Sequence, residues 1–344
     1  MNIQDLVRDN IKALQPYASA RDEYKEDSSS MVFLDANENP FNNGVNRYPD
    51  PQQTCIKDIL SKQKGVSKQN ILLGNGSDEV LDLIFRAFCE PNKDNIITLP
   101  PTYDMYEVLA NVNAVEVVKV NLSKSFQPKV NDIIRAANSF SKILFLCSPN
   151  NPTGNSFKTE DVEKLITEFK GIVVIDEAYI DFSKQKSWLN RLAEFPNLII
   201  TQTFSKAYGM AGIRLGICYA SNEIISILNK IKPPYNVNGL TQQKALERLS
   251  EPQEVTKEIT NILNQRKCII TQLNKISWVE TIYPTDANFV LVKVDNAAKR
   301  YTELLKKGIV VRNRTNQQGC KMCLRFTIGS QIENEKLMNA LKTL

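Results

Sequence analysis

The sequence predicts an α/β protein in which a large domain, built on a mainly parallel and doubly wound sheet, is joined to a smaller α+β domain. From about residue 71, continuously apolar runs such as KILFLC and GIVVID alternate with amphipathic helical stretches, which is typical of parallel strands covered on both faces. Near residue 233 the run PPYNVNG breaks this pattern, and helices mixed with strands follow it. The 344 residues are enough for two domains.

The first half of the chain predicts an arm, a turn-rich linker and then strand–helix units. Residues 1–30 are the arm, with one helix in which Ile3, Val7 and Ile11 recur at helical spacing. The run FLDANENPF predicts a short strand that leads into an Asn-rich turn. The runs ILLGN and VLDLIFRAF predict a strand and the helix after it, and in TEDVEKLITEFK we expect Thr159 to be the N-cap.

The second half predicts the smaller domain. A long helical region is expected from Thr241 to about Asn274, followed by the strand-like runs NFVLVKV, GIVVRN and CLRFTI. Further helices are expected around 297–307 and at the end of the chain. The expected division is an arm at 1–30, a large domain at 46–237, and a small domain made of 31–45 and 238–344.

Composition narrows the function. The net charge of +5 is mild and no basic block stands out, so we expect a small anionic substrate and no nucleic acid partner. The chain opens without a signal-peptide pattern and no apolar stretch reaches 18 residues, so we expect a cytoplasmic protein without membrane contact. Seven cysteines, an odd number, favour reduced thiols, and the isolated pair Cys320 and Cys323 predicts no metal site.

The absence of histidine excludes Ser-His-Asp triads, His-paired cysteine nucleophiles and His-based zinc catalysis. In the run TFSKAYGMAGIRLG, Lys206 follows an apolar stretch, so it is expected at the carboxyl end of a buried strand, where open α/β sheets hold ligands. Such a lysine loses its charge readily and forms Schiff bases with carbonyl compounds, whereas Arg214 stays charged and suits a phosphate. The pair indicates a phosphorylated carbonyl cofactor, although a surface lysine after a strand fits this segment equally well.

Three other segments, each expected just after a strand, indicate the same cofactor. GNGSDE offers the amino end of a helix to a phosphate, unless Ser77 is a plain N-cap. In SPNNPTG, Asn151 either points its amide at the site or only forms a turn. Asp176, at the mouth of a buried strand, needs a cationic partner such as a protonated pyridine nitrogen. Tyr179 could donate its phenol to a ring oxygen, and Glu177 is expected to point away and to be structural.

The motifs ANENP, NNPTG, DEAY, SK and the trailing arginine occur here in one order. In this the chain resembles the pyridoxal-phosphate-dependent aminotransferases of the aspartate aminotransferase fold, over essentially its whole length. The segments LQPYASARDEY, RYPDP and LRFTIG are similar to those of the histidinol-phosphate aminotransferase family, which implies transamination between histidinol phosphate and 2-oxoglutarate. The resemblance also implies that Lys206 forms the internal aldimine and moves the proton between Cα of the amino donor and C4′ of the cofactor.

The resemblance assigns further residues to pyridoxal phosphate. Asp176 would bind the pyridine nitrogen, Tyr179 and Asn151 the ring oxygen, and Tyr103 the ring face. The cofactor phosphate would be bound by the amides of Ser77 and Asp78, by Thr203, Ser205 and Arg214, and by Tyr48 of a neighbouring subunit. The last contact implies a homodimer with shared active sites.

Substrate choice is expected to rest on the small domain. Arg312 and Arg325 lie in or beside strand-like runs, and two arginines suit a phosphate or a carboxylate. Arg314 is an alternative to Arg312. The resemblance adds the hydroxyl of Tyr17 in the arm, which would bind the substrate phosphate, and Asn37 of the ANENP turn, which either lines the pocket or forms the turn.

The cofactor motifs leave other activities open. They also fit a threonine-phosphate decarboxylase or an aromatic amino acid aminotransferase of this fold, and the run PYASARDEY favours the histidinol-phosphate family. A regulator that uses such a domain only to sense its ligand would carry an added DNA-binding module, for which the arm of about 30 residues is too short.

Overall fold

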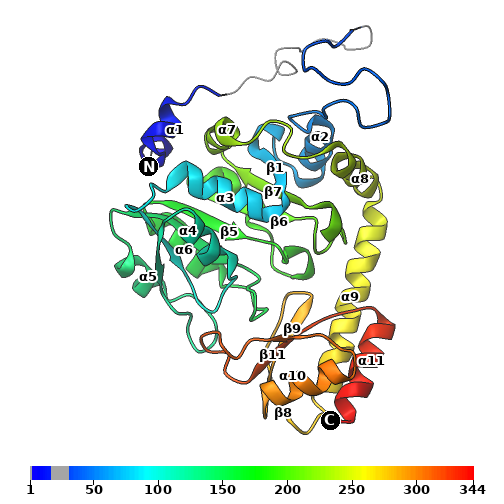
Figure 1. The fold of residues 1–344 in the computed structure, drawn as a ribbon. Helices are drawn as coiled ribbons and strands as arrows, with labels where there is room; N and C mark the ends of the chain where they lie inside the picture. The colour runs from blue at the N-terminus through cyan, green and yellow to red at the C-terminus, as the bar shows by residue number, and fades with distance from the viewer. Residues whose placement is uncertain (1, 17–30) are drawn as a thin grey trace.

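The computed structural model describes residues 2–16 and 31–344, and two β-sheets organise it (Figure 1). The larger sheet has seven strands in the order β1-β7-β6-β5-β4-β2-β3, and the smaller has four in the order β10-β11-β9-β8. In the larger sheet β7 is antiparallel to both of its neighbours, β1 and β6, and the remaining pairs are parallel. The predicted α/β class with a mainly parallel sheet is therefore confirmed.

The large sheet and its helices extend from the amino terminus to residue 249. The strands are β1 (Ile71–Asn75), β2 (Asn95–Thr98), β3 (Glu116–Lys119), β4 (Ser141–Cys147), β5 (Ile172–Asp176), β6 (Leu198–Thr203) and β7 (Leu215–Ala220). The helices are α1 (Asp9–Ala13), α2 (Thr54–Lys64), α3 (Gly76–Phe88), α4 (Met105–Val112), α5 (Val130–Ala136), α6 (Thr159–Glu168), α7 (Asn222–Ile231) and α8 (Gly239–Leu249).

The helices cover both faces of this sheet because successive side chains of a strand point to opposite sides. In β4, Leu144 joins the core formed with α2, α5, α6 and α8, whereas Phe145 joins the core formed with α3, α4 and α7. Both side chains are almost completely buried. Central strands such as β4 and β5 are therefore apolar at successive positions, which is the pattern that the sequence showed.

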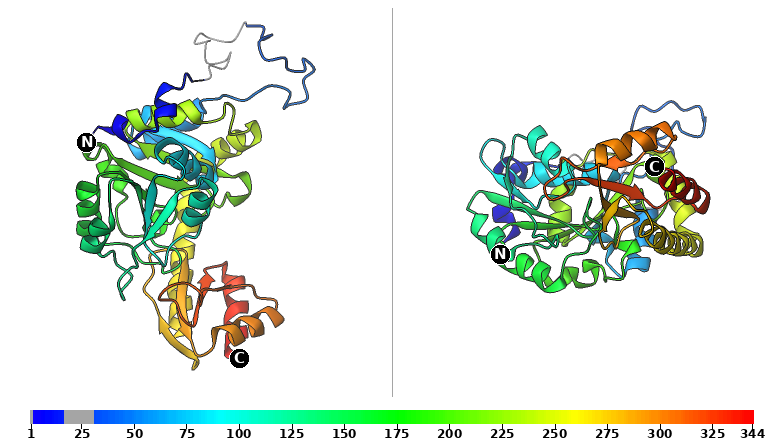
Figure 2. Two further views of the ribbon diagram at one scale, coloured as in Figure 1. Left: turned by 60° about the vertical axis from the view of Figure 1, so that its left-hand side comes forward. Right: turned by 90° about the horizontal axis from the view of Figure 1, so that it is seen from below.

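The smaller sheet has only antiparallel pairs. Its strands are β8 (Val279–Ile282), β9 (Phe289–Val294), β10 (Arg312–Asn313) and β11 (Cys323–Thr327), and its helices are α9 (Pro252–Leu273), α10 (Ala297–Lys306) and α11 (Gln331–Lys342). Leu273, Leu304 and Leu337 bring the three helices into one core with the sheet. The long helix α9 runs from the large sheet to the small one in both side views (Figures 1 and 2).

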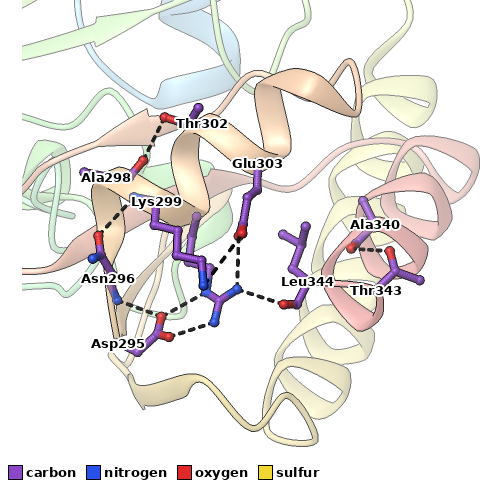
Figure 3. Close-up of polar contacts among 10 residues, drawn as sticks. Asp295, Asn296, Ala298, Lys299, Thr302, Glu303, Ala340, Thr343 and Leu344 are labelled. Carbon is purple, nitrogen blue, oxygen red and sulfur yellow. Dashed lines mark hydrogen bonds and ion pairs between the residues drawn. The ribbon is translucent and has the colours of Figure 1, made fainter.

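A buried arginine ties the small sheet to the carboxyl terminus. The guanidinium of Arg300 donates to both carboxylate oxygens of Asp295, at 2.9 and 2.7 Å, to Glu303 at 3.0 Å and to the carbonyl of Leu344 at 2.9 Å (Figure 3). Its other face lies 4.7 Å from the ring centre of Trp278. Each N–H group that leaves water thus finds a charged or polar partner, which a buried guanidinium requires.

Several local expectations were wrong. The run FLDANENPF forms no strand, because the side chains of Asn39, Asn42 and Asn43 accept hydrogen bonds from backbone N–H groups two residues on. By contrast, the helical region expected from Thr241 to about Asn274 is confirmed; it consists of two helices, since Pro252 begins α9. Thr159 is the first residue of α6, and Lys158 has the N-cap position.

In the small sheet, β8 was missed, and of the run GIVVRN only Arg312–Asn313 pairs as a strand. At the amino terminus the expected single helix is a 3-10 turn, Ile3–Leu6, followed by α1. Ile3, Val7 and Ile11 are buried in the core of α3 and α7, so this segment packs on the large sheet. The domain boundary expected between residues 237 and 238 would assign α8 to the small domain and α2 to the large one, although these two helices pack together.

No helix within 2–16 and 31–344 has the length and apolar character to cross a membrane.

Candidate active site

A cavity of about 200 Å³ opens where β4, β5 and β6 end and α3 begins. Strand ends at this edge of an open α/β sheet are where ligands bind. The cavity is lined by Ser77, Asp78, Tyr103, Cys147, Asn151, Asp176, Ala178, Tyr179, Thr203, Ser205, Lys206, Ala211 and Arg214. Ten of these residues are candidates from the sequence, so segments up to 137 positions apart in the chain meet in one place.

One end of the cavity is suited to a phosphate. It is formed by the amino end of α3, whose first N–H groups have no partner within the helix. The guanidinium of Arg214 lies over it, 3.5 Å from a carboxylate oxygen of Asp78 and 3.4 Å from the hydroxyl of Ser205. Thr203 accepts a hydrogen bond from the backbone N–H of Ser205 at 3.1 Å. Cationic, hydroxyl and amide groups therefore converge on this end.

Asp176 occupies the other end and is 2% exposed. One carboxylate oxygen accepts from the hydroxyl of Tyr106 at 2.7 Å, and the other from the backbone N–H of Ala178 at 3.1 Å. Burial raises the pKa of Asp176, and the hydrogen bond from Tyr106 is the main opposing influence. A carboxylate in this position gains most from a cationic ligand group.

Glu177, the next residue, has a different environment. Its carboxylate accepts from the Trp188 N–H at 2.7 Å, the Ser187 hydroxyl at 2.5 Å and the Gln202 amide at 2.9 Å. The side chain is 1% exposed and does not line the cavity. Its contacts are all with neighbouring backbone and side chains, in keeping with the structural role expected for it.

Lys206 follows β6 and presents its amine to the cavity, 5.8 Å from the ring centre of Tyr179. Loss of solvent around the amine lowers the pKa of Lys206, and the charge of Arg325 adds to this effect. The carboxylates of Asp176 and Asp78 act in the opposite direction. The amine is thus easier to deprotonate than an ordinary lysine, which is a condition for a nucleophile or a proton carrier.

Arg325 of β11, in the small sheet, contacts the lining of the cavity without being part of it. It donates to the side-chain oxygen of Asn151, and its guanidinium lies 5.0 Å from the ring centre of Phe289. Burial, with the charges of Arg314 and Arg312, lowers the pKa of Arg325 to about 10, so it is still a cation at neutral pH. Its Nε is buried without a hydrogen-bond partner in the described part of the chain. An anionic ligand would satisfy it.

The structure separates the two alternatives for the second arginine. Arg314 donates to Asp104 at 3.2 Å, and Gln317 donates to the same carboxylate at 2.7 Å. Arg312 lies directly opposite Arg325 in the β10–β11 pair and is exposed. Among the described residues Arg312 has no ion pair, so Arg312 is the arginine with a free charge.

Of the remaining candidates, Arg312 and Arg325 are not part of the cavity lining, and three others lie elsewhere. Tyr17 is outside the described residues. Asn37 and Tyr48 line a separate cavity of about 680 Å³. The ring of Tyr48 stacks on that of Tyr235, with centres 4.5 Å apart. Within one chain, therefore, Asn37 and Tyr48 are not brought to Lys206.

Two residues of the site were not anticipated. Cys147 ends β4 and lines the cavity, and Tyr106 donates to Asp176 from α4. A signal for Tyr106 was present in the run TYDMY, because a residue three positions after Tyr103 lies on the same face of a helix. Which strand that face meets depends on tertiary packing.

The family model for aminotransferase class I and II matches residues 22–344, and the chain belongs to this class of enzymes. It is 62% identical to the histidinol-phosphate aminotransferase of Flavobacterium johnsoniae over 344 residues, which covers 100% of this chain and 99% of the relative. Within the class, the chain is therefore a member of the histidinol-phosphate aminotransferase family.

Solved structures give the same result for the fold. The histidinol-phosphate aminotransferase from Clostridium acetobutylicum superposes with a TM-score of 0.80 at 28% identity, covering 87% of this chain and 90% of that one. The Sinorhizobium meliloti enzyme, solved in complex with pyridoxal-5′-phosphate, has a TM-score of 0.78 at 23% identity and covers 86% and 82%. At the latter identity the likeness shows the fold alone.

Proposed function

We propose that this chain transfers the amino group of L-histidinol phosphate to 2-oxoglutarate, giving imidazole acetol phosphate and L-glutamate, with pyridoxal 5′-phosphate as cofactor. The observation that carries the proposal is the convergence of Lys206, Asp176 and Arg214 on one cavity. The family membership of the chain supports the same reaction. The threonine-phosphate decarboxylase alternative is disfavoured by the 62% identity over the full length of an aminotransferase.

The residues present fit this cofactor. The amino end of α3, Ser205 and Arg214 would hold its phosphate, and Asp176 would pair with the protonated ring nitrogen. Tyr179 and Asn151 line the cavity where they would donate to the ring oxygen. When bound, the cofactor supplies an electron sink for the bond that breaks at Cα of the amino donor.

Lys206 would carry the proton between Cα of the donor and C4′ of the cofactor. The lowered pKa of its amine makes it a better base at neutral pH than an exposed lysine. The Tyr103 hydroxyl donates to Asp78 at 3.2 Å, which fixes the ring at the cavity wall where it would pack on the cofactor. Arg325 and Arg312 would bind the substrate phosphate in one half-reaction and a carboxylate of glutamate in the other.

We further propose that the enzyme is a homodimer. Val32, Leu34 and Phe41 are 81, 85 and 80% exposed, and they belong to a segment that stands away from the body of the chain (Figures 1 and 2). Exposed apolar side chains in such a number mark an interaction surface. A second copy covering this segment would also bring its own Tyr48 to the partner's cofactor phosphate.

A cytoplasmic location belongs to the same proposal. All seven cysteines are free thiols, among them the buried Cys147 and Cys218. Unpaired thiols are usual in a reducing compartment.

The test is a turnover assay on the purified protein with histidinol phosphate and 2-oxoglutarate. We expect release of glutamate, and we expect Lys206→Ala to lower kcat by at least about 10⁴-fold because the proton carrier is gone. Ser183→Ala, outside the cavity lining, is the control and should keep wild-type activity. Carbon dioxide evolved from threonine phosphate, or undiminished turnover by Lys206→Ala, would refute the proposal.

A further inference from the structure

A buried hydroxyl lies behind the carboxylate of the active site. Tyr106 of α4 is 0% exposed, and its hydroxyl donates to Asp176 at 2.7 Å. Its ring stacks on Phe145 of β4, with centres 4.5 Å apart and an interplanar angle of 9°. The edge of the same ring meets Tyr103 at 5.6 Å and 89°. The Tyr106 side chain therefore contacts both the carboxylate and the aromatic ring that border the cavity.

We propose that Tyr106 is a positioning residue: its hydroxyl keeps Asp176 ionised and turned toward the cofactor's ring nitrogen, and its ring sets the place of Tyr103. This inference rests on the proposed function, because it assumes a cationic ring nitrogen in the cavity. Tyr106 itself does not line the cavity, so it acts through its two neighbours.

The chemistry requires such a donor. A carboxylate that must bind a cationic ring has to be charged before the ring arrives, yet burial favours its neutral form. Burial and the Asp176 charge also raise the pKa of Tyr106, so its hydroxyl remains a donor throughout the neutral range. Because the chain contains no histidine, only tyrosine or tryptophan can supply an uncharged aromatic side chain that donates a hydrogen bond.

Among the described residues, Asp176 forms no ion pair with a cationic side chain. The titratable groups that face it are Asp78 of α3, Tyr103 before α4, Tyr106 of α4, Cys147 of β4, and Tyr179 and Lys206 from the loops after β5 and β6. Of these, Asp78 disfavours a second negative charge, and the positive charge of Lys206 is attracted by both the Asp176 and the Asp78 carboxylate. The hydrogen bonds of Tyr106 and the Ala178 N–H are thus the principal support for the charged form.

The test compares Tyr106→Phe with Tyr219→Phe. Phenylalanine keeps the ring and its stacking but removes the hydroxyl. Tyr219 is an equally buried tyrosine of β7 whose hydroxyl has no hydrogen-bond partner in the described part of the chain, so it controls for the loss of a buried hydroxyl. We expect the dissociation constant of pyridoxal phosphate, followed by its absorbance, to rise about ten- to hundredfold in Tyr106→Phe, as for a lost hydrogen bond to a charged group. Tyr219→Phe should bind as the wild type does.

A second readout needs no cofactor. Because the pKa of Asp176 is raised in the folded state, the folded protein loses stability relative to the unfolded one as pH rises through that pKa. Tyr106→Phe should raise this pKa further, so its melting temperature without cofactor should fall below the wild-type value by more at the alkaline end of the stable pH range than at the acidic end. A purely steric defect would lower it equally at both ends.

Asp176→Asn separates the possible outcomes. In that background Tyr106→Phe should cause no further loss of cofactor affinity, because no charge is left to support. Cofactor affinity of Tyr106→Phe within twofold of the wild type, or a pH-independent loss of stability, overturns the inference. If the wild-type protein binds no pyridoxal phosphate, the proposed function fails instead, and the cofactor-free measurement still decides whether Tyr106 holds Asp176 in its charged form.

Discussion

The adjacent carboxylates of Asp176 and Glu177, at the end of β5, differ in their environment and in what they can bind. Asp176 faces the cavity and has two hydrogen-bond donors in the protein, whereas Glu177 has three and faces away. The difference follows from the alternation of side chains along a strand. As a result, the carboxylate of Asp176 can still bind a cationic ligand, whereas the carboxylate of Glu177 is fully occupied by its protein partners.

The arginines of the small sheet make a prediction at the same scale. Arg312→Gln should raise KM for histidinol phosphate about ten- to hundredfold, since one charge-assisted contact with the phosphate is lost. Arg314→Gln is the matched control, and its effect on KM should be at most about fivefold, because Arg314 is paired with Asp104. Initial rates over a range of histidinol phosphate concentrations provide both constants. A larger effect of Arg314→Gln would transfer the substrate role to Arg314.

At the scale of elements, the corner between β1 and α3 depends on close approach. Gly76 has φ +73°, and a Cβ there would lie 2.5 Å from the guanidinium of Arg214. Its N–H also donates to the carbonyl of Arg214 at 3.0 Å, which joins the start of α3 to the start of β7. The helix end and the arginine that form the phosphate end of the cavity therefore hold each other in place.

Gly76→Ala tests this coupling against Gly65→Ala. Gly65 ends α2 with φ +69° and open space around it, so alanine there adds only backbone strain of about 1 kcal/mol. Gly76→Ala should cost a similar amount in the free energy of unfolding and should also weaken cofactor binding at least about tenfold, because Arg214 must move away from the phosphate. Chemical denaturation and cofactor titration measure the two effects. Equal cofactor affinity in both variants would show that Arg214 adapts freely.

For the whole molecule, two features agree with the proposed dimer. Tyr48 stacks on Tyr235 outside the Lys206 cavity, and the apolar segment around Phe41 is exposed. Both features are expected if a second copy covers the segment and receives Tyr48 at its own cavity.

Subunit mixing tests the shared site. Lys206→Ala and Tyr48→Ala should each have low activity alone. After the two variants are unfolded and refolded together, activity should rise several-fold, because a mixed dimer has one site with both residues intact, provided by different chains. Sedimentation of the wild type should show a dimer. A monomer, or a mixture no more active than its parts, would contradict the shared site.

Much of this protein could be predicted from its sequence because the signals are local. The apolar runs of β1, β4, β5 and β6 and the polar residues after them identified the large sheet and the cavity residues Asn151, Asp176, Tyr179 and Lys206, and the family resemblance supplied others such as Tyr103 and Thr203. β8, with its half-exposed and exposed residues, has no such apolar run and was missed.

The sequence by itself determined the class of sheet, the strand ends and the residues that suit a phosphorylated pyridine cofactor, since each follows from spacing within a few residues. Only the tertiary structure showed that Tyr106 donates to Asp176 and that Arg314 is paired with Asp104, whereas Arg312 has no ion pair among the described residues. These contacts join residues 70 and 210 positions apart. Their geometry depends on how α4 packs on the large sheet and on how the segment after β10 meets Asp104, which no local pattern encodes.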